Sequence, residues 1–109
     1  MINGGAGKDL ICGGTGEDTL RGSTGGDALI GGGGNDTLSG GDGADDLLGN
    51  AGKDRLNGGK GPDDLSGGAG NDKLMGGPGN DRIVGGGGTD RGDGGPGTDT
   101  FRSTEVRKN

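Results

Sequence analysis

The chain has 109 residues, of which 35 are Gly, and its formal net charge is −6. Nine Leu, four Ile, two Val and one Phe make up about 15% of it, and chains with less than about 20% of these residues usually stay disordered. No run approaches the ~18 apolar residues of a membrane helix, and no signal-peptide pattern follows Met1. These features exclude an ordinary globular domain with a large apolar core.

The acidic residues recur singly along the chain instead of forming a block. Regular spacing of this kind indicates a bound ligand rather than a solvating acidic tail. His is absent and Cys12 is the only Cys, so the chain can build neither an internal disulfide nor a nucleophile–base pair. We therefore expect no enzymatic activity.

A nine-residue repeat begins at Gly4 and runs without insertion to Arg102. In chain order the eleven copies are GGAGKDLIC, GGTGEDTLR, GSTGGDALI, GGGGNDTLS, GGDGADDLL, GNAGKDRLN, GGKGPDDLS, GGAGNDKLM, GGPGNDRIV, GGGGTDRGD and GGPGTDTFR. Gly occupies the first and fourth places and Asp the sixth place in every copy, and the eighth is apolar in ten. Residues 1–102 therefore form one predicted repeat domain, and we expect the non-repeat tail 103–109 to be frayed.

Each copy predicts a loop followed by a short strand, from loop 4–9 and strand 10–12 to loop 94–99 and strand 100–102. The six loop residues are mostly Gly, which permits tight turns with positive φ. The last three places alternate outward, inward and outward, which is the period of a strand with one buried side chain. So short a strand cannot bury its apolar residue alone, so successive copies must stack as a solenoid.

Two copies per coil would give an eighteen-residue turn with a strand on each side. The apolar side chains would then form two buried ladders. One would contain Ile2, Leu20, Leu38, Leu56 and Leu74, and the other Ile11, Leu29, Leu47, Leu65, Ile83 and Phe101.

Three copies depart from the pattern. Ser23 and Asn50 replace the second Gly; Asn tolerates a left-handed backbone and Ser does so less readily. Gly92 stands where the tenth copy needs an apolar residue. We expect Phe101, in the same coil, to fill part of the gap that Gly92 leaves.

The consensus G-G-x-G-x-D-x-U-x, where U is apolar, resembles the RTX (repeats-in-toxin, haemolysin-type) calcium-binding repeat. The resemblance covers residues 4–102. It implies an all-β fold, a right-handed parallel β-roll (β-solenoid) with two nonapeptides per coil and Ca²⁺ between stacked loops. It also implies an extracellular or cell-surface protein exported by type I secretion.

Ca²⁺ prefers six to eight oxygens from carboxylates and backbone carbonyls, and a Gly-rich loop ending in Asp supplies both. The predicted carboxylate ligands are Asp9, Asp18, Asp27, Asp36, Asp45, Asp54, Asp63, Asp72, Asp81, Asp90 and Asp99. The predicted carbonyl ligands are Gly14, Gly16, Gly32, Gly34, Gly41, Gly43, Gly59, Gly61, Gly68, Gly70, Gly77 and Gly79. Six loops on one edge and five on the other leave gaps for at most about nine ions.

The leading hypothesis is a module of a secreted bacterial toxin, protease, lipase or adhesin that folds when Ca²⁺ binds. Two alternatives stay open: a structural or adhesive spacer of a cell-surface protein, and a non-catalytic fragment of a secreted enzyme. The ninth places of the odd copies form a column on the outer face, namely Cys12, Ile30, Leu48, Ser66, Val84 and Arg102. Four of these six are apolar. Either these residues are there because they favour strands, or they form a contact for a neighbouring domain or chain.

Overall fold

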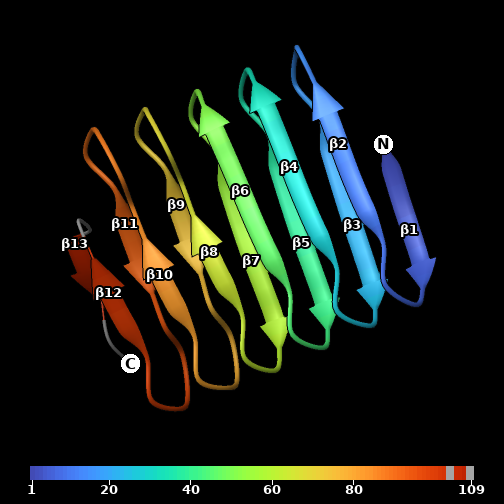
Figure 1. The fold of residues 1–109 in the computed structure, drawn as a ribbon. Coiled ribbons are helices and arrows are strands. Elements are labelled where there is room, and N and C mark those ends of the chain that lie inside the picture. Colours follow the sequence, from blue (N-terminus) through green and yellow to red (C-terminus); the bar gives the residue numbers. More distant parts are fainter. Residues whose placement is uncertain (103–104, 108–109) are drawn as a thin grey trace.

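The computed structural model describes residues 1–102 and 105–107. The chain winds as a flattened coil whose strands alternate between two facing parallel sheets (Figure 1). Odd-numbered strands form the seven-stranded sheet A and even-numbered strands the six-stranded sheet B. The strands are β1 (Ile2–Ala6), β2 (Leu10–Gly14), β3 (Thr19–Thr24), β4 (Ala28–Gly33), β5 (Thr37–Asp42), β6 (Asp46–Ala51), β7 (Arg55–Lys60), β8 (Asp64–Ser66), β9 (Lys73–Met75), β10 (Arg82–Val84), β11 (Arg91–Asp93), β12 (Thr100–Arg102) and β13 (Glu105–Arg107). Across the described ranges, no helix is long and apolar enough to cross a membrane.

The register of the sheets confirms two repeats per coil. On sheet A, Leu20 is the partner of Leu38, which is in turn the partner of Leu56. On sheet B, Leu29 pairs with Leu47 in the same way. Each partner lies eighteen residues further along the chain, so the fold is the predicted β-solenoid.

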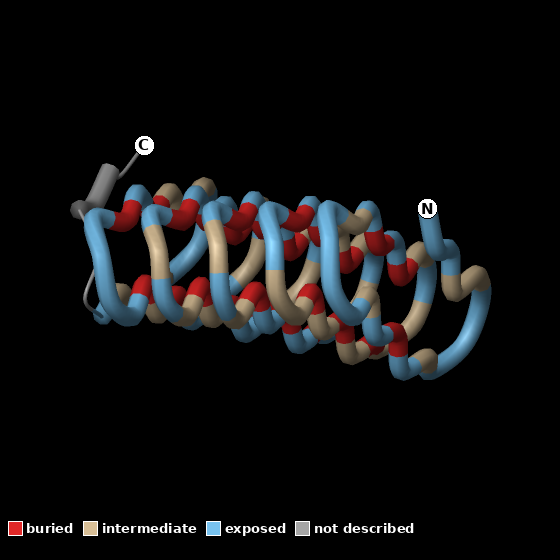
Figure 2. The backbone as a smooth tube through the Cα atoms, turned by 90° about the horizontal axis from the view of Figure 1, so that it is seen from above, coloured by how far each residue is buried: buried red, intermediate tan, exposed pale blue. Residues whose placement is uncertain are grey.

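The core is a double column of apolar side chains between the sheets. Figure 2 shows the buried positions recurring along both sides of the coil. The fully buried members are Ile11, Leu20, Leu29, Leu38, Leu47, Leu56, Leu65, Leu74 and Ile83. The two predicted ladders are therefore confirmed, although Ile2 on β1 is 39% exposed and Phe101 on β12 is only partly buried.

The strands of the N-terminal half of the coil are longer than three residues. Strands β1 to β7 have five or six residues and extend into the glycines of the following loop, as at the partners Gly41 and Gly59. The last six strands have the expected three residues. After β9 and β11, Pro78 and Pro96 occupy the third loop place, and Pro has no N–H to continue the ladder.

The described part of the C-terminal tail is a short strand, and the expected fraying of residues 103–109 stays a prediction. Residues 105–107 form β13, which pairs with β11 so that Val106 lies opposite Gly92. The partners are fourteen residues apart here instead of eighteen, so the chain returns to sheet A without a full loop. Residues 103–104 and 108–109 lie outside the described part of the chain.

Phe101 occupies the space that Gly92 leaves, as expected. A methyl carbon on Gly92 would lie 3.2 Å from Cδ1 of Phe101 and 3.4 Å from Cγ2 of Ile83. Phe101 also packs against the core cluster. The missing side chain of the tenth copy is thus compensated by the largest apolar side chain of the eleventh.

We therefore predict that Gly92→Leu lowers the melting temperature of the folded form, because overpacking a filled site costs about 1–3 kcal/mol. Adding Phe101→Leu should recover most of the loss, since it removes the ring that the new side chain meets. Thermal melts of both variants decide this. Unchanged melting in both would show that neither residue is packed.

Candidate metal centre

All eleven Asp residues at the sixth place of the repeat lie in loops at the two edges of the coil. The first edge carries Asp9, Asp27, Asp45, Asp63, Asp81 and Asp99. The second edge carries Asp18, Asp36, Asp54, Asp72 and Asp90. Because coils stack in register, each Asp lies one coil from the next on its edge. The structure thus brings the predicted carboxylates together as two ladders.

In nine of the eleven Asp residues, one carboxylate oxygen ties the loop to the preceding loop. The N–H of Asp36 donates to Oδ1 of Asp54 at 2.8 Å, and the N–H of Asp54 donates to Oδ1 of Asp72 at 2.8 Å. Nine such bonds span the two edges, five on the first and four on the second. They fall in the nine gaps expected between stacked loops.

The other carboxylate oxygen has no partner. In all eleven Asp residues Oδ2 is buried and makes no hydrogen bond in the structure. A buried polar group left unsatisfied costs about 1–3 kcal/mol, and more if it is charged. Eleven repetitions of this arrangement in one small chain indicate places where a cation belongs.

The first Gly of the repeat lies directly beside the unpartnered Oδ2 atom. A methyl carbon on Gly31 would lie 2.6 Å from Oδ2 of Asp36 and 3.0 Å from the carbonyl oxygen of Gly49 in the next coil. The same crowding recurs at Gly13, at 2.8 Å from both Asp18 Oδ2 and the Gly31 carbonyl. A carboxylate of one loop and a carbonyl of the next therefore converge where a side chain would otherwise stand.

These first-place carbonyls were not among the predicted ligands. The first Gly does not have positive φ, unlike the second and fourth, so its presence in all eleven copies reflects space and not backbone conformation. Whether space or backbone conformation requires this Gly can be seen only from the contact between coils. The presence of Gly at the first place in every copy nevertheless marked the position as important.

The predicted carbonyls of the second and fourth Gly also face the gaps between loops. A methyl carbon on Gly32 would clash with the carbonyl oxygen of Gly14 in the preceding coil, and one on Gly34 would clash with that of Gly16. Ser23 and Asn50 share the positive φ of this place, at 89° and 72°. The hydroxyl of Ser23 donates to Oδ1 of Asn3 at 2.8 Å, which anchors the less tolerant residue.

The donor set of these edges is oxygen alone. In the described part of the chain, no three His, Cys, Asp or Glu side chains are close enough together to hold a metal ion by themselves, so an ion would take many of its ligands from carbonyls. Carboxylate with carbonyl oxygens is the set that Ca²⁺ prefers, whereas Zn²⁺ in structural sites takes four Cys or His ligands. The residues present therefore fit calcium.

A further ladder was missed at the fifth place of the repeat. Oδ1 of Asn35 accepts a hydrogen bond from the N–H of Lys53 at 2.8 Å, one coil later. Asn71 and Asn80 make the same bond to the next coil. In the sequence, these positions are marked by Asn directly before Asp in three copies. The bonds join neighbouring coils without a metal ion.

Burial raises the pKa of the central carboxyl groups. Desolvation is the largest cause, opposed by the backbone hydrogen bond and reinforced by neighbouring Asp charges. The pKa of Asp63 rises to about 7 and that of Asp54, Asp72 and Asp81 to about 6, and the pKa of Asp45 is also raised. Without a cation, the folded form therefore resists carrying these charges at neutral pH.

These shifts predict that acid favours the metal-free fold. A carboxyl whose folded pKa is raised contributes stability that is fully present below its unfolded value of 3.8 and lost as pH rises through about 6–7. Circular dichroism in chelator should therefore show more β structure at pH 4.5 than at pH 7.5. Less β structure at the lower pH would contradict the assignment of buried, unpaired carboxylates.

The chain was compared with known families and proteins. The model of the RTX calcium-binding nonapeptide repeat matches residues 1–20, 13–47, 21–56, 48–81 and 66–101. No curated protein and no solved structure matches the chain. The family matches span nearly all of the coil, and they agree with the register and with the loop oxygens described above. The chain therefore belongs to the RTX calcium-binding nonapeptide repeat family.

Proposed function

We propose that this chain is a Ca²⁺-triggered folding module of a secreted protein, with Ca²⁺ held between stacked loops. The observation that carries the proposal is the set of eleven buried Oδ2 atoms without a partner. Each would regain a partner in a bound cation. The bound ion supplies positive charge at the loop edges, and the chain supplies the oxygens and the apolar ladders that pack once the loops are closed.

The ligands in this proposal come from both loops that border a gap. Between the loops of Asp36 and Asp54, the oxygens would be the two carboxylates together with Gly carbonyls of both loops. The first-place carbonyl of Gly49 joins the second- and fourth-place carbonyls of Gly32 and Gly34 in this role. Nine gaps give up to nine ions, and loops at the ends of each edge contribute to only one.

Mass action supports folding outside the cell. Extracellular-type sites have Kd values of about 10⁻⁴ to 10⁻³ M, so ~2 mM Ca²⁺ stabilises the folded form by roughly 0.6–1.8 kcal/mol per site. Nine coupled sites give about 5–16 kcal/mol, which covers the ~5–15 kcal/mol typical of a folded domain. In a cytosol poor in Ca²⁺ the chain would stay unfolded and fit for export.

A spacer or contact role is the second candidate, and a specific surface favours it. Cys12, Ile30 and Leu48 are successive partners on the outer face of sheet B, and Leu48 is 37% exposed. An open groove of about 370 Å³ runs along this stripe. Such a stripe could hold a neighbouring domain or chain. Many more repeats in a longer reading frame would favour this candidate.

Catalysis forms no part of the proposal, because His is absent and Cys12 is exposed and unpaired. The remaining alternative is that the chain is the non-catalytic part of a secreted enzyme. A catalytic domain upstream in a longer reading frame would favour that alternative, and it leaves the calcium chemistry unchanged.

The direct test of calcium-triggered folding is circular dichroism during a Ca²⁺ titration. At neutral pH we expect a disordered spectrum in chelator and a steep transition to β structure in millimolar Ca²⁺. Mg²⁺ should act poorly, since it requires a smaller and nearly octahedral shell. A folded spectrum in chelator at neutral pH, or equal folding by Mg²⁺, would refute the proposal.

Two Asp variants locate the effect in the loops. Asp54→Asn removes a buried loop carboxylate, whereas Asp46→Asn removes an exposed one on β6. Only the first should raise the Ca²⁺ midpoint. Equal midpoints would mean that the response depends on net charge and not on the loop ligands.

Two Gly variants within one loop test the site geometry. Gly31→Ala would place its methyl group on Asp36 Oδ2 and the Gly49 carbonyl, whereas nothing lies within 4 Å of a methyl group on Gly33. We expect Gly31→Ala to raise the Ca²⁺ midpoint. Gly33→Ala should leave it unchanged or lower it slightly, because Ala restricts the unfolded chain by about 0.4–1 kcal/mol. If Gly33→Ala raised the midpoint more than Gly31→Ala, the ion would not be bound by the oxygens that converge on the first Gly.

A further inference from the structure

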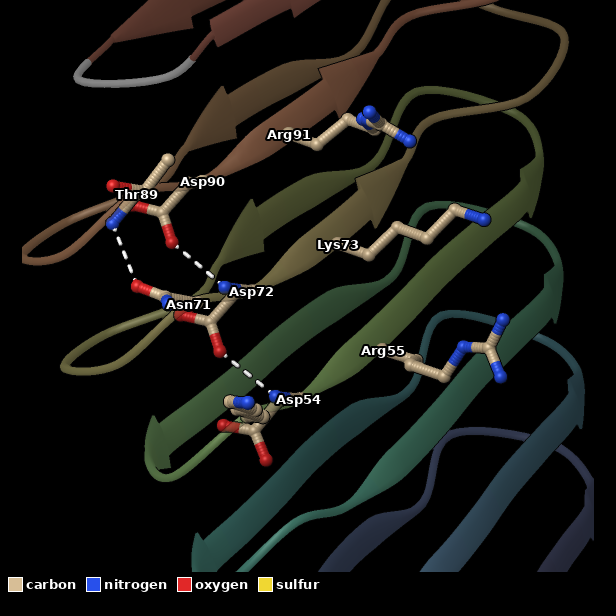
Figure 3. A pocket seen from close by; sticks show the side chains of 9 residues that line it. Asp54, Arg55, Asn71, Asp72, Lys73, Thr89, Asp90 and Arg91 are labelled. Atoms are coloured by element: carbon tan, nitrogen blue, oxygen red, sulfur yellow. Dashed lines mark hydrogen bonds between the residues drawn. The ribbon is translucent and has the colours of Figure 1, made fainter.

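Three basic residues stand in one column on the outer face of sheet A. Arg55 on β7 is the partner of Lys73 on β9, and Lys73 is the partner of Arg91 on β11. All three are exposed. Figure 3 shows their side chains extending side by side, away from the loop carboxylates. We call these three residues the basic column.

The column has an electrostatic cost between β7, β9 and β11, although the next register partner of Arg91 is an acidic residue, Glu105 of β13. Neighbouring strands lie about 4.8 Å apart, and like charges directly opposite one another destabilise a sheet. Within residues 1–102, none of the three makes an ion pair with a carboxylate. The arrangement is also unusual in a chain whose net charge is −6. An anion lying along the column would remove this repulsion.

A groove accompanies the column. It is open to solvent, has a volume of about 410 Å³ and is lined by the basic column, by Lys53 and by three loop carboxylates, Asp54, Asp72 and Asp90 (Figure 3). This volume falls within the ~300–1,000 Å³ of small-molecule sites. The groove thus combines four cations with one of the proposed calcium edges.

Bound calcium would raise the net charge of the groove. This step rests on the proposed function. Without metal, the lining of the groove carries four side-chain cations and three carboxylates, which leaves one net positive charge. The two gaps bordered by Asp54, Asp72 and Asp90 would each take one Ca²⁺, which raises the net charge to five. A weakly charged groove therefore becomes strongly cationic in the calcium-loaded form.

We propose that this groove binds a ligand carrying two or more phosphate groups when calcium occupies the second edge. Arg presents a planar fork that suits phosphate oxygens, and Lys adds a point charge. The column spans two strand spacings, about 10 Å, which is long enough for two phosphates. The same chemistry occurs in soluble organic bisphosphates and in phospholipid headgroups.

The experiment measures binding to the full chain in 2 mM CaCl₂, a concentration of the order of extracellular Ca²⁺ site affinities. One arm titrates fructose 1,6-bisphosphate by calorimetry. A second arm sediments the chain with vesicles of phosphatidylglycerol or, for comparison, phosphatidylcholine. Binding in the first arm identifies a soluble bisphosphate, and binding to phosphatidylglycerol alone identifies headgroups arrayed on a surface.

Arg91→Gln and Arg82→Gln form a matched pair. Both Arg residues occupy the seventh place directly after a loop Asp, but Arg82 lies on β10 of sheet B, away from the groove. Arg91→Gln should weaken binding about tenfold to a hundredfold, as expected for a lost hydrogen bond to a charged group. Arg82→Gln should leave the affinity unchanged, and circular dichroism verifies that both variants fold in Ca²⁺.

Two results would overturn the inference. If the chain folds in Ca²⁺ but binds neither probe, the phosphate-binding inference is wrong and the proposed function is unaffected. Equal weakening by Arg91→Gln and Arg82→Gln would reduce the effect to general charge attraction. Failure of the chain to fold in Ca²⁺ would instead refute the proposed function and this inference with it.

Discussion

The buried carboxylate at the end of each loop is the constraint on which the rest of the structure depends. Its Oδ1 holds the preceding loop and its Oδ2 lies buried without a protein partner. The apolar ladders contribute one side chain per repeat, which is too little to offset eleven such groups and the entropy of 35 Gly residues. Under the proposed function the fold is therefore conditional, because the same atoms that define the coil would oppose it until a cation is bound.

Periodicity was sufficient to predict most of the fold. The nine-residue period predicted the loops, and the need to bury the eighth side chain predicted stacking. With two repeats per coil, as the family resemblance implied, both apolar ladders followed. The compensation between Gly92 and Phe101 was also predictable, because coil membership follows from counting. These features depend only on spacing, which a single sequence displays completely.

Features that depend on contacts between coils were harder to predict. The first Gly is required because Asp Oδ2 and a carbonyl of the next coil converge on it, and no property of one repeat reveals that crowding. The Asn35 ladder, the longer strands β1 to β7 and the pairing of β13 with β11 are of the same kind. Each arises from backbone groups of neighbouring coils, whereas sequence patterns report mainly on side chains.

Because each coil contains two repeats, odd- and even-numbered repeats lie on opposite sheets. Because partners lie eighteen residues apart, insertion of eighteen residues would lengthen the roll and leave every downstream side chain on its sheet. Insertion of a single nonapeptide would preserve the loops and the core but move all downstream residues to the opposite sheet. Arg55, Lys73 and Arg91 would then share a face with the apolar stripe near Leu48. A surface built on one sheet can therefore survive only duplications of whole coils, which constrains how such arrays grow by gene duplication.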